Sequence, residues 1–539
     1  MNMKKSSRYI FSLVLATILA SCTGDFAEIN TDPTKSTPSN FDANYFLSNA
    51  EWNHLTGIWG YAGPILFQSG WVQTLASTST LGASYYSNAD RYVQSTNTNS
   101  YLASTWNNCY RAASLANEAV KLSVDKPELV NLHAAATIIK ILSIHVISDT
   151  YGDAPYTQAL QASTGVTLPV YDSQQELYPM LLADLEKAIN EFDESKPKPN
   201  SDIFPYKGDI PKWRKFGYSL MLRMAMRLTK VSESTAKTYA EKAAGKTFTS
   251  VADDAVVIGD VSNYTNGNGT ALVTAADFYE VRWSKTFIDY LRDNNDPRLG
   301  IVAEVPQAGL AANQNTALAG DDDPSIQVGL PNGYDLKGGA TDVSNEPDYP
   351  GSTGAGADKT PIGNYSRPKT SLYGQKNAAF FVVTYAQTEL LLAEAKVRGF
   401  SVGTTTAAQH YHNGVEAALL TLAPLGAGAV VVPGDASAFA DASPLAESTK
   451  EASLAMINTQ YWATTSTLMD FSEAWSNWRR SGYPNLTPVN YTGNFSGGTI
   501  PRRQPYPTTE PTLNPANYQT AAGRLQGGDT WTSRIWWDQ

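Results

Sequence analysis

Aromatic and polar side chains gather in one early segment of the chain, in a pattern that suits the binding of flat, uncharged ligands. Tyrosine and tryptophan rings can stack on the apolar face of a sugar, while amide, carboxylate and guanidinium groups hydrogen-bond to its hydroxyls. The Tyr85–Tyr86 pair is surrounded by Gly, Ser and Asn, so we expect these rings to be exposed. The candidate ligand-binding residues of this segment are Trp71, Tyr85, Tyr86, Asn88, Asp90 and Arg91.

A second source of binding residues is the irregular region after Asp296, where Tyr334 and Tyr365 are the candidate ligand contacts. Long segments without regular structure are usually functional, which favours this region as part of a binding face. An alternative stays open, because a large core also accounts for most aromatic residues. In that alternative, rings such as Trp59 and Trp71 only pack the N-terminal region.

The sequence carries no motif of the common hydrolytic or phosphate-handling enzymes, such as Gly-X-Ser-X-Gly, His-Glu-X-X-His or a glycine-rich phosphate loop. His410 and His412 would lie on different faces of a helix, and the acidic run at 321–323 lacks the alternating spacing of a calcium loop. We therefore predict no catalytic residue, no metal and no cofactor. A pair of carboxylates that hydrolyses glycosidic bonds stays possible, because only their separation in space is diagnostic.

The composition and the net charge indicate a folded protein that does not bind nucleic acid. Hydrophobic residues make up 42% of the 539 residues and charged residues 17%, which is typical of a globular chain. The formal net charge is −11, whereas phosphate binding needs a basic surface, so nucleic acid is excluded as a partner. Cys109 lies between Trp106 and Tyr110, a setting that predicts a buried thiol on a helix.

The N-terminus has the features of a bacterial lipoprotein signal. Three basic residues, the last of them Arg8, precede an apolar run at 9–20, which is too short for a stable membrane span and fits a signal-peptide core. The run ends in Leu19-Ala20-Ser21-Cys22, which resembles a lipobox. We expect residues 1–21 to be removed and Cys22 to carry acyl chains such as palmitate, which would tether the mature chain to a membrane.

The elements that must position these residues are mainly helices. Apolar residues recur at intervals of three and four, and Ser173 with Glu176 forms an expected capping box. The predicted fold class is mainly α, a tetratricopeptide-like helical scaffold with a loop-rich ligand or partner face and few short strands, in a single domain over 22–539. The expected helices are 42–55, 106–122, 125–149, 173–189, 209–228, 385–398, 407–420 and 468–480. The expected long loops are about 232–275, 293–375 and 421–448.

Short motifs occur in a fixed order along nearly the whole mature chain. They are Phe26–Asn30 with Asp32-Pro33, Asp149–Tyr156, Pro169–Ser173, Trp213–Phe216 with Leu222–Arg227, Asp296–Leu299, Leu391–Ala395, Glu473–Trp475 with Arg479-Arg480, and Pro501–Arg503. Each motif alone is weak, but their joint order is specific. The chain therefore resembles the SusD/RagB-like outer-membrane nutrient-binding lipoproteins, in a divergent branch of that family.

The resemblance implies a binding protein and not an enzyme. It implies a lipid-anchored, surface-exposed protein of the outer membrane that binds oligosaccharides or similar oligomeric nutrients. It also implies a partner, a SusC-like TonB-dependent transporter that receives the nutrient. Three other functions stay open from the sequence: a lipid-anchored glycan-degrading enzyme, a peptide-binding SusD-like receptor, and a subunit that seals the transporter without touching cargo.

Most of the matching motifs have the character of scaffold residues. The Tyr151–Asp153 stretch is expected to end a helix and turn the chain. Arg227, Arg298 and Arg480 are expected to hold loops through bidentate pairs, with Glu394 as the partner of one such arginine.

Overall fold

A computed structural model describes residues 41–78, 85–94, 96–273, 279 and 281–539. The chain divides into two compact units, residues 1–43 and 44–539, and the fold described below is that of the second unit. The expected signal peptide and the lipidation site Cys22 lie outside the described residues.

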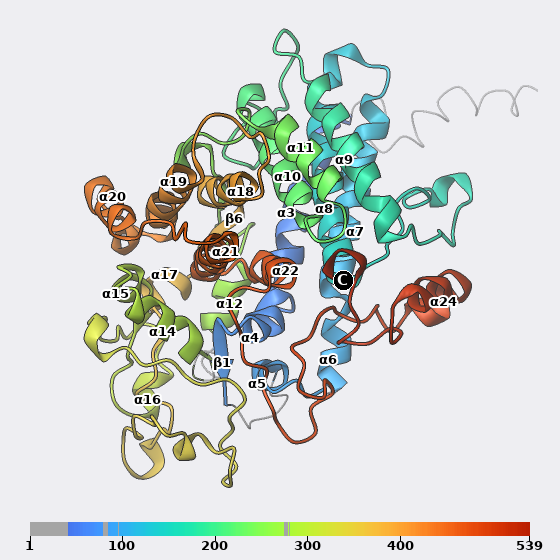
Figure 1. Cartoon of the computed structure of the whole chain (residues 1–539). Helices are drawn as coiled ribbons and strands as arrows, with labels where there is room; N and C mark the ends of the chain where they lie inside the picture. Colours follow the sequence, from blue (N-terminus) through green and yellow to red (C-terminus); the bar gives the residue numbers. More distant parts are fainter. Residues whose placement is uncertain (1–40, 79–84, 95, 274–278, 280) are drawn as a thin grey trace, which may run out of the picture. The chain divides into compact units, whose positions relative to one another are not determined.

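The first half of this unit is an array of helices, each packed on the next. Helix α3 packs on α7, α7 on α8, α8 on α9, α9 on α10 and α10 on α11 (Figure 1). Fully buried alanines such as Ala112, Ala116 and Ala119 line α7 and let its neighbours approach closely. The bounds are α3 Asn44–Trp59, α7 Ala103–Ser123, α8 Val130–Tyr151, α9 Gln174–Glu191, α10 Ile210–Arg227 and α11 Glu233–Ala243. Cys109 of α7 is a buried free thiol, as predicted.

A second group of helices follows in the C-terminal half. Helix α18 packs on α19 as the expected antiparallel pair, and Gly414 lies so close to Leu390 that an added Cβ would come within 2.8 Å of that side chain. Thr384 and Gln387 form a capping box at the start of α18. The bounds are α18 Tyr385–Val397, α19 Ala407–Leu420, α20 Pro433–Ala442, α21 Lys450–Thr467 and α22 Phe471–Ser481.

The apolar segment Pro127–Tyr151, which contains α8, is long and hydrophobic enough to cross a membrane, but 78% of its most apolar window is buried inside the protein. It contacts α3, α7, α9, α10 and α22, so it is a core helix of the scaffold. The segment ends at Gly152, whose φ of +99° turns the chain toward Asp153. This agrees with the turn expected at residues 151–153.

In the part of the chain that the structure describes, three antiparallel two-stranded sheets join segments far apart in the sequence. Strand β1 (Leu75–Ser77) pairs with β3 (Val281–Trp283), β2 (Ala255–Ile258) with β6 (Ala379–Val383), and β4 (Ala303–Glu304) with β5 (Arg367–Pro368). The register places Ala76 opposite Arg282 and Val257 opposite Phe380. The prediction of a mainly helical fold with few short strands is confirmed.

Several predicted element bounds were wrong. The expected loop 232–275 contains α11 and β2, and the expected loop 421–448 contains α20. The helix expected at 468–480 is α22, which begins at Phe471 because the chain turns at Met469, which has a φ of 58°, and α21 before that turn was not predicted. Short helices occupy the loop-rich parts of the chain. They are α4 Gln68–Trp71, α5 Tyr85–Asp90, α6 Thr96–Tyr101, α12 Gly267–Val273, α14 Lys285–Asp293, α15 Arg298–Val302, α16 Leu310–Asn313, α17 Thr370–Tyr373, α23 Glu510–Leu513 and α24 Pro515–Arg524.

Buried arginines form ion pairs with carboxylates, as the sequence predicted, but Arg227 and Arg480 join helices to one another and do not hold loops. Arg480 donates to both oxygens of Glu394 at 2.6 and 2.7 Å, in a bidentate pair between α22 and α18. Arg227 of α10 bonds Asp149 at 3.1 Å and Glu473 at 2.6 Å. Burial alone would raise the pKa of Glu394, but Arg480 and its helical neighbour Arg398 lower it to about 2. The carboxylate therefore stays ionised in the core.

Candidate functional site

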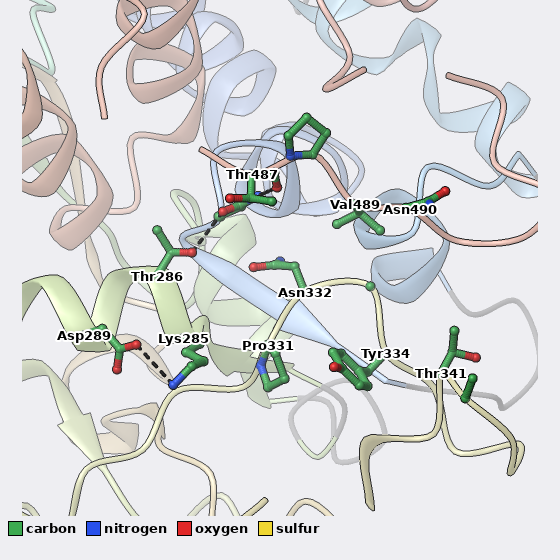
Figure 2. A pocket seen from close by; sticks show the side chains of 14 residues that line it. Lys285, Thr286, Asp289, Pro331, Asn332, Tyr334, Thr341, Thr487, Val489 and Asn490 are labelled. Carbon is green, nitrogen blue, oxygen red and sulfur yellow. Dashed lines mark hydrogen bonds and ion pairs between the residues drawn. The ribbon is translucent and has the colours of Figure 1, made fainter. Parts of the chain in front are cut away.

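A pocket of about 510 Å³ opens where three segments distant in sequence meet (Figure 2). One side is the start of α14, the second is the loop at 331–341, and the third is the C-terminal segment 487–490. Its lining residues are Gln73, Lys285, Thr286, Asp289, Pro331, Asn332, Gly333, Tyr334, Ala340, Thr341, Thr487, Pro488, Val489 and Asn490. The volume lies within the usual range for small-ligand sites.

Backbone hydrogen bonds fix the start of α14 against its neighbours. Ser284 caps the helix, because its hydroxyl accepts from the Phe287 N–H at 3.1 Å. The Ser284 N–H donates to the Thr74 carbonyl at 2.9 Å, and the Lys285 N–H donates to the Leu330 carbonyl at 2.8 Å. The β1–β3 pairing and the strand-like contact at Leu330 therefore bring residues 73, 285 and 331 to one place.

Tyr334 rests on a small hydrophobic core within the loop region. Leu330, Val343, Ile362 and Tyr365 are buried in this cluster, and Tyr334 packs against it as a half-buried ring. A ring supported on one side and reachable on the other can act as a stacking platform. Tyr334 is the predicted ligand contact that the structure brings into the pocket.

Asp90 fixes the position of the pocket loop at 331–341 through hydrogen bonds. Its carboxylate accepts hydrogen bonds from the Asn332 side chain and from the Gly333 N–H, the latter at 2.7 Å. Asn332 also donates to the Leu75 carbonyl at 2.9 Å, and Gly333 has a φ of +87° with Val489 packed against it. Burial raises the pKa of Asp90 to about 7, although the two loop donors and Arg91 lower it in part.

Arg91 supports the third segment of the pocket. Its guanidinium lies 4.9 Å from the centre of the Tyr491 ring, and the Tyr491 hydroxyl donates to Asp335 at 2.6 Å. The chain Arg91–Tyr491–Asp335 thus ties the C-terminal segment to the loop that carries Tyr334. Arg91 and Asp90 are both nearly fully buried, so each acts on the pocket through its neighbours.

The pocket wall is close to electrically neutral. Among the described residues that line it, Lys285 is the only cation, and its ammonium lies 3.2 Å from both Asp289 and Asp348. Although burial lowers the pKa of Lys285, these two carboxylates raise it overall, so the ion pairs are kept. The remaining polar groups are amides and hydroxyls, which suit the hydroxyls and amides of a neutral ligand. Among the described residues, no group of three or more His, Cys, Asp or Glu is placed to hold a metal ion.

The expectation that Tyr86 is exposed was wrong, and two other candidate rings are also buried. Trp71 is fully buried, with ring centres 5.2 Å from Trp475 and 5.7 Å from Trp531. Tyr86 is 5% exposed on helix α5, and Tyr365 is fully buried beneath Tyr334. The C-terminal rings cover Trp71 and the loop cluster covers Tyr365, so in this conformation neither ring presents a face to a ligand.

Two predicted ligand contacts remain, Asn88 and Tyr85. Asn88 is half-buried on α5, two residues before Asp90, and does not line the pocket, and the side chain of Tyr85 lies outside the described part of the chain. As ligand contacts these two residues stay predictions.

Sequence reasoning missed most of the pocket residues. Lys285, Thr286 and Asp289 lie on a short helix that the sequence analysis did not predict, and Thr487 and Asn490 come from a segment with no regular structure. The Pro-Asn-Gly run at 331–333 beside Tyr334 is a turn signal that marks one wall. Nothing in the sequence indicates that segment 487–490 packs against this loop.

Comparison with solved structures finds the same fold in other proteins. A protein described as a chitin-binding protein is 29% identical, with a TM-score of 0.77 over 92% of this chain and 100% of its own. One described as Bacteroidetes AC2a SusD-like is 24% identical, with a TM-score of 0.76 over 93% and 100%. A chitin-binding SusD homolog from Flavobacterium johnsoniae is 22% identical, with a TM-score of 0.70 over 92% and 98%.

No curated protein matched this chain. The SusD-like family described as "Starch-binding associating with outer membrane" matches residues 35–507, which is most of the chain. The ordered motifs, the helical scaffold and this match agree. The chain therefore belongs to that SusD-like family.

Proposed function

We propose that this chain is a cell-surface receptor that binds a neutral oligosaccharide in the pocket around Tyr334 and passes it, unaltered, to a transporter. The observation that carries the proposal is the pocket itself. It combines a supported aromatic ring with amide and hydroxyl groups on a wall whose single cation is paired. An aromatic platform with neutral polar groups around it is what a sugar ring requires.

Oligomers of N-acetylglucosamine are the first ligands to test. One protein of the same fold, 29% identical, is described as chitin-binding. The pocket suits such a ligand because Asn332 and Asn490 supply amide groups that can hydrogen-bond to hydroxyls and to acetamide groups. A charged sugar fits less well, because Lys285 is already neutralised by two aspartates.

Binding is favoured over hydrolysis by the acidic residues of the pocket. Two carboxylates about 5 to 10 Å apart are needed to cleave a glycosidic bond. Asp289, the acidic residue among the described lining residues, and Asp348 beside it are both paired with Lys285 at 3.2 Å, and a carboxylate held in an ion pair is a poor acid or base for this reaction. The family descriptions also name binding proteins. The proposed role is therefore recognition and transfer.

The membrane anchor and the transporter partner are proposed from the N-terminal sequence and from the family resemblance. We propose that Cys22 carries the lipid that holds the chain at the outer membrane, since Leu19-Ala20-Ser21-Cys22 has the lipobox pattern. The resemblance to SusD/RagB-like proteins supports a SusC-like TonB-dependent transporter as the recipient of the glycan.

Isothermal titration of the mature chain with a hexamer of N-acetylglucosamine tests the binding role. We expect Tyr334→Ala to weaken binding by about 1–3 kcal/mol, the value of one lost stacking platform. Tyr239→Ala is the matched control, because Tyr239 is a half-buried tyrosine on the surface of α11. Equal affinities of the Tyr334 and Tyr239 variants, or shortened sugar chains after incubation, would refute the proposal.

A further inference from the structure

A second cavity, of about 610 Å³, lies in the helical scaffold and shares no residue with the pocket around Tyr334. Its walls are α7, α8, α9 and the loop that follows Pro155. Its lining residues are Asn117, Lys121, Lys140, Tyr156, Thr157, Ala159, Leu160, Gln161, Met180, Ala183 and Asp184. The cavity thus combines a tyrosine, a lysine and a carboxylate with an apolar floor.

Lys140 reaches this cavity from the core helix α8. Its ammonium lies 5.8 Å from the centre of the Tyr156 ring and makes no hydrogen bond or ion pair with any residue in the described part of the chain. The side chain is half-buried, and burial lowers the pKa of Lys140, while Asp184 acts in the opposite direction. A half-buried amine without a close acceptor favours a ligand oxygen placed beside it.

The loop that closes the cavity is fixed. The N–H groups of Tyr156 and Thr157 donate to Asp172 at 2.7 and 2.9 Å, and the Thr157 hydroxyl donates to the same carboxylate at 2.7 Å. Leu160 has a φ of 62°, a left-handed conformation that a bulky residue rarely adopts. Such strain is concentrated at ligand sites, where the surrounding structure holds it in place.

The polar groups of the cavity suit a sugar hydroxyl more than an ion. The Tyr156 hydroxyl donates to Asp184, and Lys121 is paired with Glu118 at 2.8 Å, so the charges of the cavity balance. A hydroxyl can accept from the Lys140 ammonium and donate to the Asp184 carboxylate at the same time, whereas a ligand carboxylate can only accept and a ligand ammonium can only donate. Met180 and Leu160 offer apolar contacts for the ring.

We propose that this cavity, in which Lys140 and Asp184 face Tyr156, is a second binding site for a neutral sugar unit. The site shares no residue with the pocket around Tyr334. A long oligomer could therefore bind to both sites at once, and a short oligomer could bind to this site alone. Two weak sites on one chain raise the apparent affinity for long oligomers, provided that the oligomer can span them.

Photoaffinity labelling of the full mature chain tests the second site. The probe is a trimer of N-acetylglucosamine that carries a diazirine, and labelled peptides are located by mass spectrometry. We expect label on the 156–161 loop and on α9, and at least a tenfold loss of that label in Lys140→Met and in Asp184→Asn. Lys187→Met is the matched control, because Lys187 is an exposed lysine of α9 outside the cavity. Thermal melts confirm that each variant is folded.

Different labelling results would refute the two proposed binding sites. Loss of label at 331–341 in Tyr334→Ala, with the α9 label kept, supports two separate sites. Absence of label from the 156–161 loop and α9 in the wild type, or label there that survives both Lys140→Met and Asp184→Asn, overturns the second site. A diazirine glucuronate that labels this cavity in place of the neutral trimer also overturns it. Absence of label at 331–341 alone counts against the pocket around Tyr334 and leaves the second site standing.

Discussion

Replacing Asp90 by asparagine should weaken sugar binding although Asp90 does not line the pocket. The carboxylate accepts from the Asn332 side chain and from the Gly333 N–H, and both residues are part of the pocket wall. An asparagine keeps one acceptor and turns an NH₂ group toward one of the two donors. One hydrogen bond is then lost, and a buried donor is left without a partner.

The expected decrease in sugar affinity follows from the loss of this hydrogen bond. A hydrogen bond to a charged acceptor contributes about 1.5–3 kcal/mol, and a buried donor without a partner costs a similar amount. If the loop moves to relieve this cost, ligand binding must restore its position, so the dissociation constant should rise by about 10- to 100-fold. Titration with the N-acetylglucosamine hexamer measures this change, and Asp435→Asn, an exposed aspartate on α20, is the control.

The same variant changes how stability depends on pH. The pKa of Asp90 rises from its ordinary 3.8 to about 7 in the folded protein, so the folded state binds the proton more tightly than the unfolded state does. Asp90 therefore contributes stability that is complete below about pH 4 and is lost as the pH rises to 7. Urea unfolding of the variant should lack this decline. Unchanged affinity together with an unchanged pH profile would refute the assigned role of Asp90.

Three further predictions concern the core, the ion pairs and the anchor. Trp71→Ala should lower the free energy of unfolding by about 3–5 kcal/mol, because it empties a buried site; loss of sugar affinity at unchanged stability would contradict this. Glu394→Gln should cost about 3–5 kcal/mol at pH 7, because Arg480 is left buried without its charge partner. The pKa of Glu394 is lowered to about 2, so its contribution is present above pH 4.5 and is lost as the pH falls, and acid unfolding of the variant should lack this step. Cys22→Ala should release the protein from membranes, and its persistence in the pellet after a high-salt wash would count against lipidation.

The scaffold could be predicted from the sequence because its signals are local. Helices α9 and α10 begin at Ser173 and Asp209, residues that cap them through their side chains, and their apolar residues recur at helical intervals. The pairing of Glu394 with a buried arginine was also predicted, because such an arginine needs a carboxylate, but the structure identifies Arg480 as the partner. Helix α21 was missed because its many Thr, Ser and Asn residues weaken the helical pattern.

The pocket could not be predicted because it depends on contacts between distant segments. Trp71 and Tyr86 are surrounded in the sequence by polar residues, yet Trp71 packs on Trp475 and Trp531, which lie about 400 residues further along the chain. Tyr334, which was predicted as a ligand contact because it lies in the irregular region after Asp296, lines the pocket, and its contact with a ligand stays a prediction. Its partners on α14 and at 487–490 are brought to it by the β1–β3 pairing and by Asp90, which no local pattern reveals.

A crystal structure of the mature protein with the N-acetylglucosamine hexamer is the decisive test of sugar binding at this pocket. We expect an intact chain of sugar units in the pocket, with one ring stacked on Tyr334 and its polar groups bonded to Asn332 or Asn490. Sugar bound only elsewhere, with this pocket empty, or a shortened chain in the pocket would contradict it.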